Sequence, residues 1–345
     1  MNARAKRLAG GLEEPLIVTT PANIRYLTGF VSSNVSLVVE PERVQLFTDF
    51  RYAEAASAVP EVEFTETRRD VITHMAEFLS GRYAFESPHV TYQQYEQLRD
   101  AGLDLVPRAG LVETLRSVKE DVELETIRRA AAVTDAVYER IVGEQFVGRS
   151  ERELAWRMDE LFHELGAEDL AFETIVAAGP NGARPHADPG DRVIEKGTTV
   201  VVDSGAVVDG YCSDCTRTFA TGELPDDLRR AYDVCLEAQL TGLGAARPGV
   251  EGKEADAAAR AVIDEAGFGK NFGHGLGHGV GLDAHEAPHV GQTSTDSLAA
   301  KNVVTIEPGI YLEGRGGIRI EDLVVITDGE PEILSSFPKE LVTVG

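Results

Sequence analysis

Residues 198–220, TTVVVDSGAVVDGYCSDCTRTFA, alternate in the manner of a β-hairpin. An apolar run leads to Asp203, and a second strand begins near Asp214. A four-residue loop at 207–210 would place Asp203 directly opposite Asp214. Like charges opposed across a hairpin are destabilising unless something positive lies between them. This stretch therefore predicts a strand pair that is built around a cation.

A second stretch repeats the arrangement. Residues 303–327, VVTIEPGIYLEGRGGIRIEDLVVIT, predict two strands joined by a loop at 312–316. That loop would place Glu307 opposite Glu321. One opposed acid pair could arise by chance, but two at matching places in a repeated pattern indicate a shared site.

The order of the predicted elements also repeats. Two helices precede each strand-rich stretch, which predicts an α+β fold with duplicated halves. The helices are expected near 119–142, 150–165, 225–243 and 251–266, and the strands in 174–220 and 272–327. Before them, strands and helices alternate in a smaller α/β segment without a glycine-rich phosphate loop. We expect two domains, residues 1–115 and 116–345.

Composition narrows the class of protein. The chain has 345 residues, of which 43% are hydrophobic, and no apolar run is long enough to span a membrane. Its net charge of −25, from 58 acids and 33 bases, argues against nucleic acid or anionic membrane as a partner. The three cysteines include one C-x-x-C pair, for which a redox or zinc role is the alternative to buried, reduced thiols. We expect a soluble cytoplasmic protein.

The four acids and a third motif favour a metal site. Residues 274–286, HGLGHGVGLDAHE, place three histidines among glycines, which allow close approach of the backbone. Four carboxylates and one imidazole balance two divalent cations, and this donor set suits Mn²⁺, with Co²⁺, Fe²⁺ or Zn²⁺ as alternatives. Such a metal pair activates water for attack on a carbonyl group. Taken singly, each acid or histidine would more often be a structural or solvated residue.

Together, these motifs resemble the Xaa-Pro peptidases, aminopeptidase P and prolidase, of the pita-bread metallopeptidase family. The most specific motifs are DSGAVVDGYCSDCTRTFA, GHGVGLDAHE, TIEPGIY and RIEDLVVIT. NIRYLTGF and LFTDFRYAEAA resemble the smaller N-terminal domain of the same enzymes. The resemblance implies a pita-bread catalytic domain with pseudo-twofold halves, preceded by a creatinase-like α/β domain. It also implies a homodimer.

The resemblance assigns a role to each motif residue. It implies that Glu307, besides binding metal, moves a proton, and that His186 and His285 contact substrate and stabilise the tetrahedral intermediate. It places His274 and Tyr311 at the substrate pocket and gives Arg319 the task of orienting the bridging ligands. The metal ligands that it implies are Asp203, Asp214, His278, Glu307 and Glu321.

One segment departs from the prolidase pattern. Prolidases often carry, between their HE and TIEP motifs, an arginine that binds the free carboxylate of a dipeptide. Residues 287–304 contain no arginine, which leaves Arg43 or Arg51 of the N-terminal segment as candidates. We therefore expect an Xaa-Pro aminopeptidase acting on peptides with proline at the second position. The alternatives are an Xaa-Pro dipeptidase and, more remotely, a creatinase-like hydrolase or a catalytically silent binding module.

Overall fold

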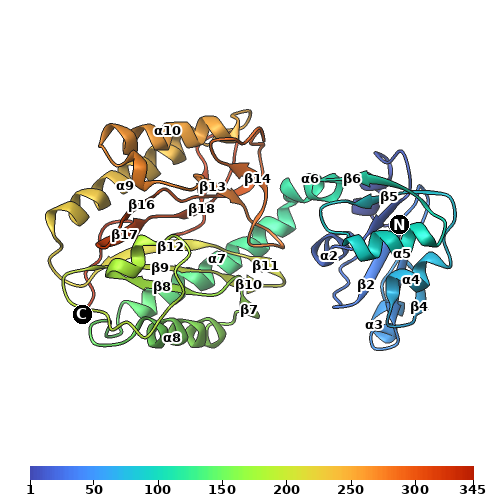
Figure 1. The fold of residues 1–345 in the computed structure, drawn as a ribbon, viewed down its shortest axis with the longest axis horizontal. Helices are drawn as coiled ribbons and strands as arrows, with labels where there is room; N and C mark the ends of the chain where they lie inside the picture. Colours follow the sequence, from blue (N-terminus) through green and yellow to red (C-terminus); the bar gives the residue numbers. More distant parts are fainter. The chain divides into compact units, whose positions relative to one another are not determined.

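The computed structural model describes residues 1–345, which divide into two compact units, Met1–Arg116 and Ser117–Gly345. The first unit contains a six-stranded sheet in the order β4-β3-β2-β1-β5-β6 (Figure 1). β2 runs antiparallel to β1 and β3, and the remaining neighbours are parallel. The strands are Leu16–Val18 (β1), Val35–Val39 (β2), Val44–Asp49 (β3), Glu63–Thr67 (β4), Arg82–Glu86 (β5) and Asp104–Arg108 (β6). The helices are Ala3–Ala9 (α1), Pro21–Thr28 (α2), Ala53–Ser57 (α3), Val71–Ala76 (α4), Tyr92–Asp100 (α5) and Leu111–Ser117 (α6).

The second unit repeats two helices followed by strands, which confirms the predicted duplication. The first half contains Asp121–Ile141 (α7), Glu151–Glu164 (α8), Asp169–Leu170 (β7), Ile175–Ala178 (β8), the 3₁₀ helix Gly179–Ala183 (η1), Thr199–Ser204 (β9), Ala206–Val208 (β10), Tyr211–Cys212 (β11) and Cys215–Ala220 (β12). The second half contains Asp226–Ala245 (α9), Gly252–Glu265 (α10), Gly269–Asn271 (η2), Gly277–Gly279 (β13), Glu286–Val290 (β14), Val303–Ile306 (β15), Gly309–Leu312 (β16), Gly316–Arg319 (β17), Asp322–Val325 (β18) and Glu332–Ile333 (β19).

Each half has its own helix-on-strand core. In the first half, side chains of α7 and α8, including Tyr138 and Phe162, pack on Phe219 of β12. In the second half, α9 and α10 pack on β15 to β18, and both helices lie along one side of the strands in Figure 1. A capping box begins α8 as predicted, because Ser150 Oγ accepts the Glu153 N–H at 3.2 Å and Glu153 Oε2 accepts the Ser150 N–H at 2.8 Å. Polar side chains at the ends of β9, β12, β15 and β17 lie outside these two cores and line a pocket instead.

The predicted register of the first hairpin is wrong. Asp209 and Gly210, with φ of 46° and 77°, form a two-residue turn in place of the expected four-residue loop. As a result, Asp203 lies opposite Thr216, two residues further along than Asp214. Asp203 and Asp214 are therefore not opposed across this hairpin, although both aspartates line the same pocket.

The predicted register of the second hairpin is confirmed by its flanking pairs. Ile306 of β15 lies opposite Asp322 of β18, and the β16–β17 pair continues in the same register. Glu307 and Glu321 occupy opposed positions where the strand pairing is interrupted between these two ladders. Their carboxylates can turn inward because neither residue belongs to a regular strand.

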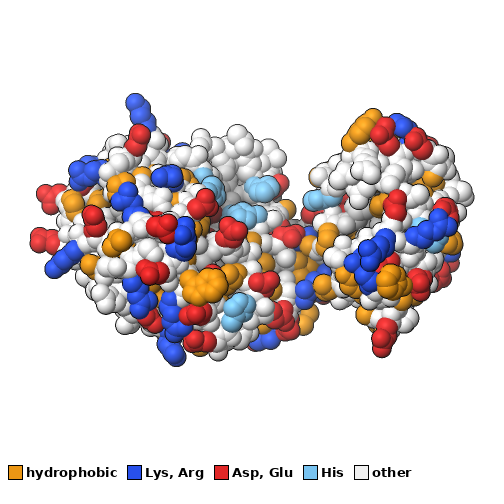
Figure 2. All heavy atoms as spheres, turned by 60° about the horizontal axis from the view of Figure 1, so that its bottom comes forward, with side chains coloured by type: hydrophobic (Ala, Val, Ile, Leu, Met, Phe, Trp, Pro, Cys, Tyr) orange, Lys and Arg blue, Asp and Glu red, His pale blue; other side chains and the backbone are white.

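The surface carries mixed charge. Figure 2 shows acidic and basic side chains interspersed over both units, and histidine side chains reach the surface close together on the second unit. None of the helices has the length and hydropathy that crossing a membrane requires. All three cysteines are buried and free.

Candidate metal centre and active site

A pocket of about 500 Å³ lies within the second unit, with walls from both halves. β9 and the ends of β12, β15 and β17 supply its charged floor. The loop after η1 and the glycine-rich stretch around β13 supply its histidines. The predicted site residues that line it are Asp203, Asp214, His278, Glu307, Glu321, His186, His274, His285 and Arg319. Tyr311 does not line the pocket, but it lies directly behind it.

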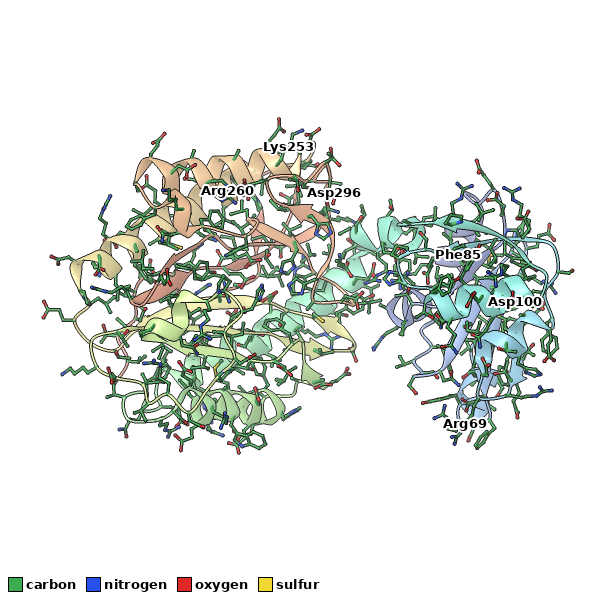
Figure 3. The ribbon with its side chains drawn as sticks, viewed as in Figure 1. Arg69, Phe85, Asp100, Lys253, Arg260 and Asp296 are labelled. Atoms are coloured by element: carbon green, nitrogen blue, oxygen red, sulfur yellow. The ribbon has the colours of Figure 1, made fainter.

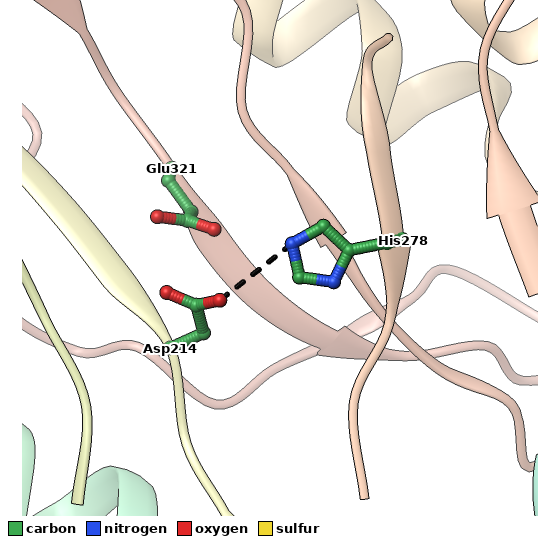
Figure 4. A group of neighbouring side chains, drawn as sticks. All are labelled: Asp214, His278 and Glu321. Atoms are coloured by element: carbon green, nitrogen blue, oxygen red, sulfur yellow. Dashed lines mark ion pairs between the residues drawn. The ribbon is translucent and has the colours of Figure 1, made fainter. Parts of the chain in front are cut away.

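Three of these residues could hold one metal ion. Asp214, His278 and Glu321 each offer a ligand atom, and these atoms lie within 4.8 Å of one another (Figure 4). His278 Nε2 is 3.7 Å from Asp214 Oδ2 and 3.3 Å from Glu307 Oε1. The other ring nitrogen, Nδ1, donates to the Gly279 carbonyl at 3.1 Å. This hydrogen bond directs Nε2 at the carboxylates and fixes the tautomer that a metal ligand requires.

Asp203 provides a test of whether a cation fits. Its Oδ2 accepts a hydrogen bond from Arg319 Nη2 at 2.6 Å. Its Oδ1 is buried and has no hydrogen-bond partner. Because buried polar atoms are almost always paired, an orphaned carboxylate oxygen facing three further acids indicates a missing positive partner. The donor set of carboxylate oxygens and one imidazole therefore fits divalent cations.

The pKa values of the acids and of His278 in this cluster are shifted by burial and by their mutual charges. Burial, followed by repulsion from neighbouring carboxylates, holds the pKa values of Asp214 and Glu321 well above their usual range. Burial also acts on Glu307, but the hydrogen bond and charge of His278 lower its pKa to about 2. The same contact raises the pKa of His278 despite the opposing effect of burial. Without a further cation, ionisation of Asp214 and Glu321 is therefore opposed by burial and by the neighbouring carboxylates.

Arg319 connects four parts of the site. Besides Asp203, its guanidinium donates to Thr216 Oγ1 at 3.0 Å, Tyr311 Oη at 2.9 Å and the Pro185 carbonyl at 3.0 Å. Thr216 in turn donates to Glu321 Oε2 at 2.7 Å. Arg319 is buried and makes four hydrogen bonds to these partners, so its guanidinium is placed to orient the carboxylates. Thr216 is the link in this set that the sequence analysis missed.

His274 is fixed from two sides. Its Nε2 and Tyr311 Oη are 2.9 Å apart, and its Nδ1 donates to the Gly275 carbonyl at 2.8 Å. Arg260 on α10, labelled in Figure 3, donates to the His274 carbonyl at 2.7 Å. Burial lowers the pKa of His274, so its imidazole is neutral at pH 7.

The two remaining histidines face the pocket from opposite halves. The His285 ring lies against the His278 ring, with centroids 4.0 Å apart and the ring planes tilted by 31°. Burial, and then the positive charge of His278, lower the pKa of His285. His186 is exposed, and its loop is held by buried Glu151, whose Oε2 accepts Asn181 Nδ2 at 2.8 Å and the Gly190 N–H at 3.0 Å. The sequence analysis missed the role of Glu151, because only the structure shows that this acid in the first turn of α8 is buried.

Comparisons with known proteins identify the family. The model for metallopeptidase family M24 matches residues 125–328, and the model for the creatinase/prolidase N-terminal domain matches residues 14–118. The chain belongs to metallopeptidase family M24. This M24 chain is 33% identical to the Xaa-Pro dipeptidase of Pyrococcus furiosus, with 99% of the chain and 100% of the relative covered.

Solved structures agree. An Xaa-Pro dipeptidase from Bacillus anthracis matches the M24 chain with a TM-score of 0.95 at 36% identity, covering 99% of each chain. An X-Pro aminopeptidase from Thermotoga maritima matches with a TM-score of 0.89 at 33% identity, covering 99% of this chain and 100% of the other. The predicted membership, the fold and the metallopeptidase class are confirmed. For the reaction, the comparisons favour the dipeptidase alternative over the expected aminopeptidase.

Proposed function

We propose that this protein is an Xaa-Pro dipeptidase that uses two divalent metal ions. The observation that carries the proposal is the convergence of four carboxylates and His278 on one pocket, with a buried Asp203 oxygen that lacks a partner. The dipeptidase names of the relatives from Pyrococcus furiosus and Bacillus anthracis support the choice of substrate.

The proposed ligands are the five residues of the charged floor. By the family resemblance, Asp214 and Glu321 would be the ligands shared by the two ions. Burial, followed by repulsion from neighbouring carboxylates, raises the pKa of both side chains. Two divalent cations would offset the four negative charges of the cluster. Mn²⁺ is our first choice for a mainly oxygen donor set with one imidazole. The ligands are Asp203, Asp214, His278, Glu307 and Glu321.

The proposed reaction uses the side chains around the pocket. Bound divalent cations would supply Lewis acidity and lower the pKa of water at this cluster. Glu307 would accept the proton from the attacking water and pass it to the leaving nitrogen. His285 and His186 would donate hydrogen bonds to the oxygen of the tetrahedral intermediate. Proline's imide nitrogen has no N–H, so none of these groups needs to recognise one.

The remaining expectations rest on the family resemblance. We propose a homodimer in which the unit 1–116 of one subunit helps to close the pocket of its partner. The substrate would carry proline at its second position. A cytoplasmic location stays a prediction. Light scattering that gives the 37.3 kDa of a single chain under assay conditions would contradict the dimer.

The second candidate is an Xaa-Pro aminopeptidase. It is favoured by the absence of arginine from residues 287–304 and by the similarity to the Thermotoga maritima enzyme. The two arginines suggested as substitutes already have acidic partners. Arg51 binds Asp49 through both Nε and Nη2, at 2.8 and 2.7 Å, and Arg43 pairs with Glu40. Each would have to share its charge to bind a dipeptide carboxylate.

The test compares kcat/KM for Ala-Pro and Ala-Pro-Ala with added Mn²⁺. A dipeptidase is expected to prefer Ala-Pro by at least about tenfold, equivalent to about 1.4 kcal/mol. A preference for the tripeptide would select the aminopeptidase. Hydrolysis of neither substrate, or full turnover in protein shown to be metal-free by elemental analysis, would contradict both.

A further inference from the structure

A buried ion pair lies outside the pocket lining. Lys119 Nζ donates to Glu286 Oε1 at 2.6 Å, and their side chains are only 1% and 5% exposed. The partners are 167 residues apart in the sequence. Burying two charges costs desolvation that their attraction often only offsets, so such a pair is weak evidence for a stabilising role. Glu286 directly follows the pocket residue His285 in the chain, so the ion pair is placed to affect the position of that histidine.

Glu286 ties its own loop together. Its carboxylate lies against Gly281, where a Cβ atom would come within 2.4 Å of Oε1. Its Oε2 is 3.5 Å from the Asp283 N–H. The loop that leads to His285 therefore packs over the Glu286 carboxylate. A shift of that carboxylate would move the backbone of Glu286 and with it the adjacent His285.

Lys119 is anchored at its own backbone. Its N–H donates to the Lys301 carbonyl at 3.0 Å. Two residues earlier, the Ser117 carbonyl accepts a hydrogen bond from Asn302 Nδ2 at 2.8 Å. The segment that carries Lys119 is thus fixed to the 299–302 turn. Its ammonium group can therefore hold the Glu286 carboxylate in one position.

We propose that Lys119 is a positioning residue that acts through Glu286. The pair sets the His285 ring against the His278 ring, at the 4.0 Å separation seen here, so that His285 faces the substrate carbonyl. Neither Lys119 nor Glu286 lines the pocket, so neither is a catalytic residue. The inference rests on the proposed function, because that function gives His285 its contact with substrate.

The test is a double-mutant cycle. Lys119→Met is expected to lower kcat by roughly ten- to a hundredfold, the usual effect of misplacing a reacting group by a fraction of an ångström to an ångström. KM and bound metal should change little. In a His285→Ala background, Lys119→Met should cost nothing further, because its effect passes through that ring. Multiplicative losses in kcat would overturn the proposal.

Two further variants separate positioning from folding. Lys253→Met is the matched control, because Lys253 on α10 forms an exposed ion pair with Glu251, and it should leave kcat unchanged. The double variant Lys119→Met/Glu286→Gln leaves no orphaned buried charge. It should unfold close to the wild-type temperature and still lose kcat. Wild-type kcat in that variant would make the pair merely structural and overturn the proposal.

A readout independent of activity completes the test. In zinc-loaded protein with ¹³C-labelled histidine, the ring signal of His285 should shift in Lys119→Met, while that of exposed His163 stays in place. An unmoved His285 signal would overturn the positioning role. Failure of the wild-type protein to cleave any Xaa-Pro peptide would instead refute the proposed function, and the spectral shift would remain a valid test of positioning.

Discussion

Replacing Arg319 with methionine would remove the buried cation that joins the two halves of the site. Arg319 is 3% exposed, and its Nη2 lies 2.6 Å from Asp203 Oδ2. Asp203 Oδ1 already lacks a partner, so the variant would leave both oxygens of that carboxylate uncompensated in the metal-free protein. Tyr311 and Thr216 would also lose a donor.

The expected magnitude follows from these contacts. Removing one member of a buried ion pair typically costs about 3–5 kcal/mol. For a unit of this size, each kcal/mol corresponds to roughly 2–4 °C in the unfolding temperature. We therefore expect metal-free Arg319→Met to unfold roughly 6–20 °C below the wild type. Methionine fills much of the same space, so a cavity adds little to this loss.

The assay is calorimetry of both proteins in chelator, with the transition of the second unit compared. Arg315→Met is the matched control on the same hairpin, because Arg315 forms an exposed pair with Asp227 at 2.8 Å. An exposed pair contributes about 0–1 kcal/mol, so the control should shift by at most a few degrees. If Arg319→Met shifted no more than Arg315→Met, the claim that Arg319 balances the buried carboxylates would be refuted.

The remaining predictions concern metal and pH. Asp214→Asn should lower activity by several orders of magnitude and reduce bound metal, because a bridging oxygen becomes a neutral amide; wild-type rates would refute the bridging assignment. His278→Ala should lose metal by elemental analysis, whereas His285→Ala should keep metal and lose turnover; equal metal loss in both would show that the loop is misassigned. Raised pKa values at Asp214 and Glu321 mean that their stabilising contribution is complete below their unfolded values and is lost as pH rises through the folded values. As pH rises above the ordinary range of these acids, about 4, the metal-free wild type should therefore lose more unfolding temperature than Asp214→Asn, which has one acid fewer to ionise, while histidines and cysteines titrate alike in both proteins; an equal loss in the two proteins would contradict the electrostatics.

Local pattern was sufficient to predict the elements of the fold. The duplicated order of helices and strands follows from hydrophobic periodicity, which is set by neighbouring residues alone. The Ser150–Glu153 capping box follows from the same kind of short-range signal. The identity of the acids also pointed to a cation, because like charges at matching places in a repeat need one. The family resemblance then supplied the roles of the histidines.

Tertiary structure decided what local pattern could not. The sequence analysis predicted a four-residue loop in the first hairpin, whereas Asp209 and Gly210, both with positive φ, form a two-residue turn that sets a different register. The sequence also indicated no partner for Arg319 beyond the bridging acids, whereas in the structure its guanidinium reaches Asp203 and Tyr311. The same is true of Lys119 and Glu286, which are 167 residues apart and meet only because the chain folds back on itself. The periodicity of a single sequence does not reveal contacts over such separations. These contacts depend on how whole helices and strands pack, and not on which residues are neighbours in the chain.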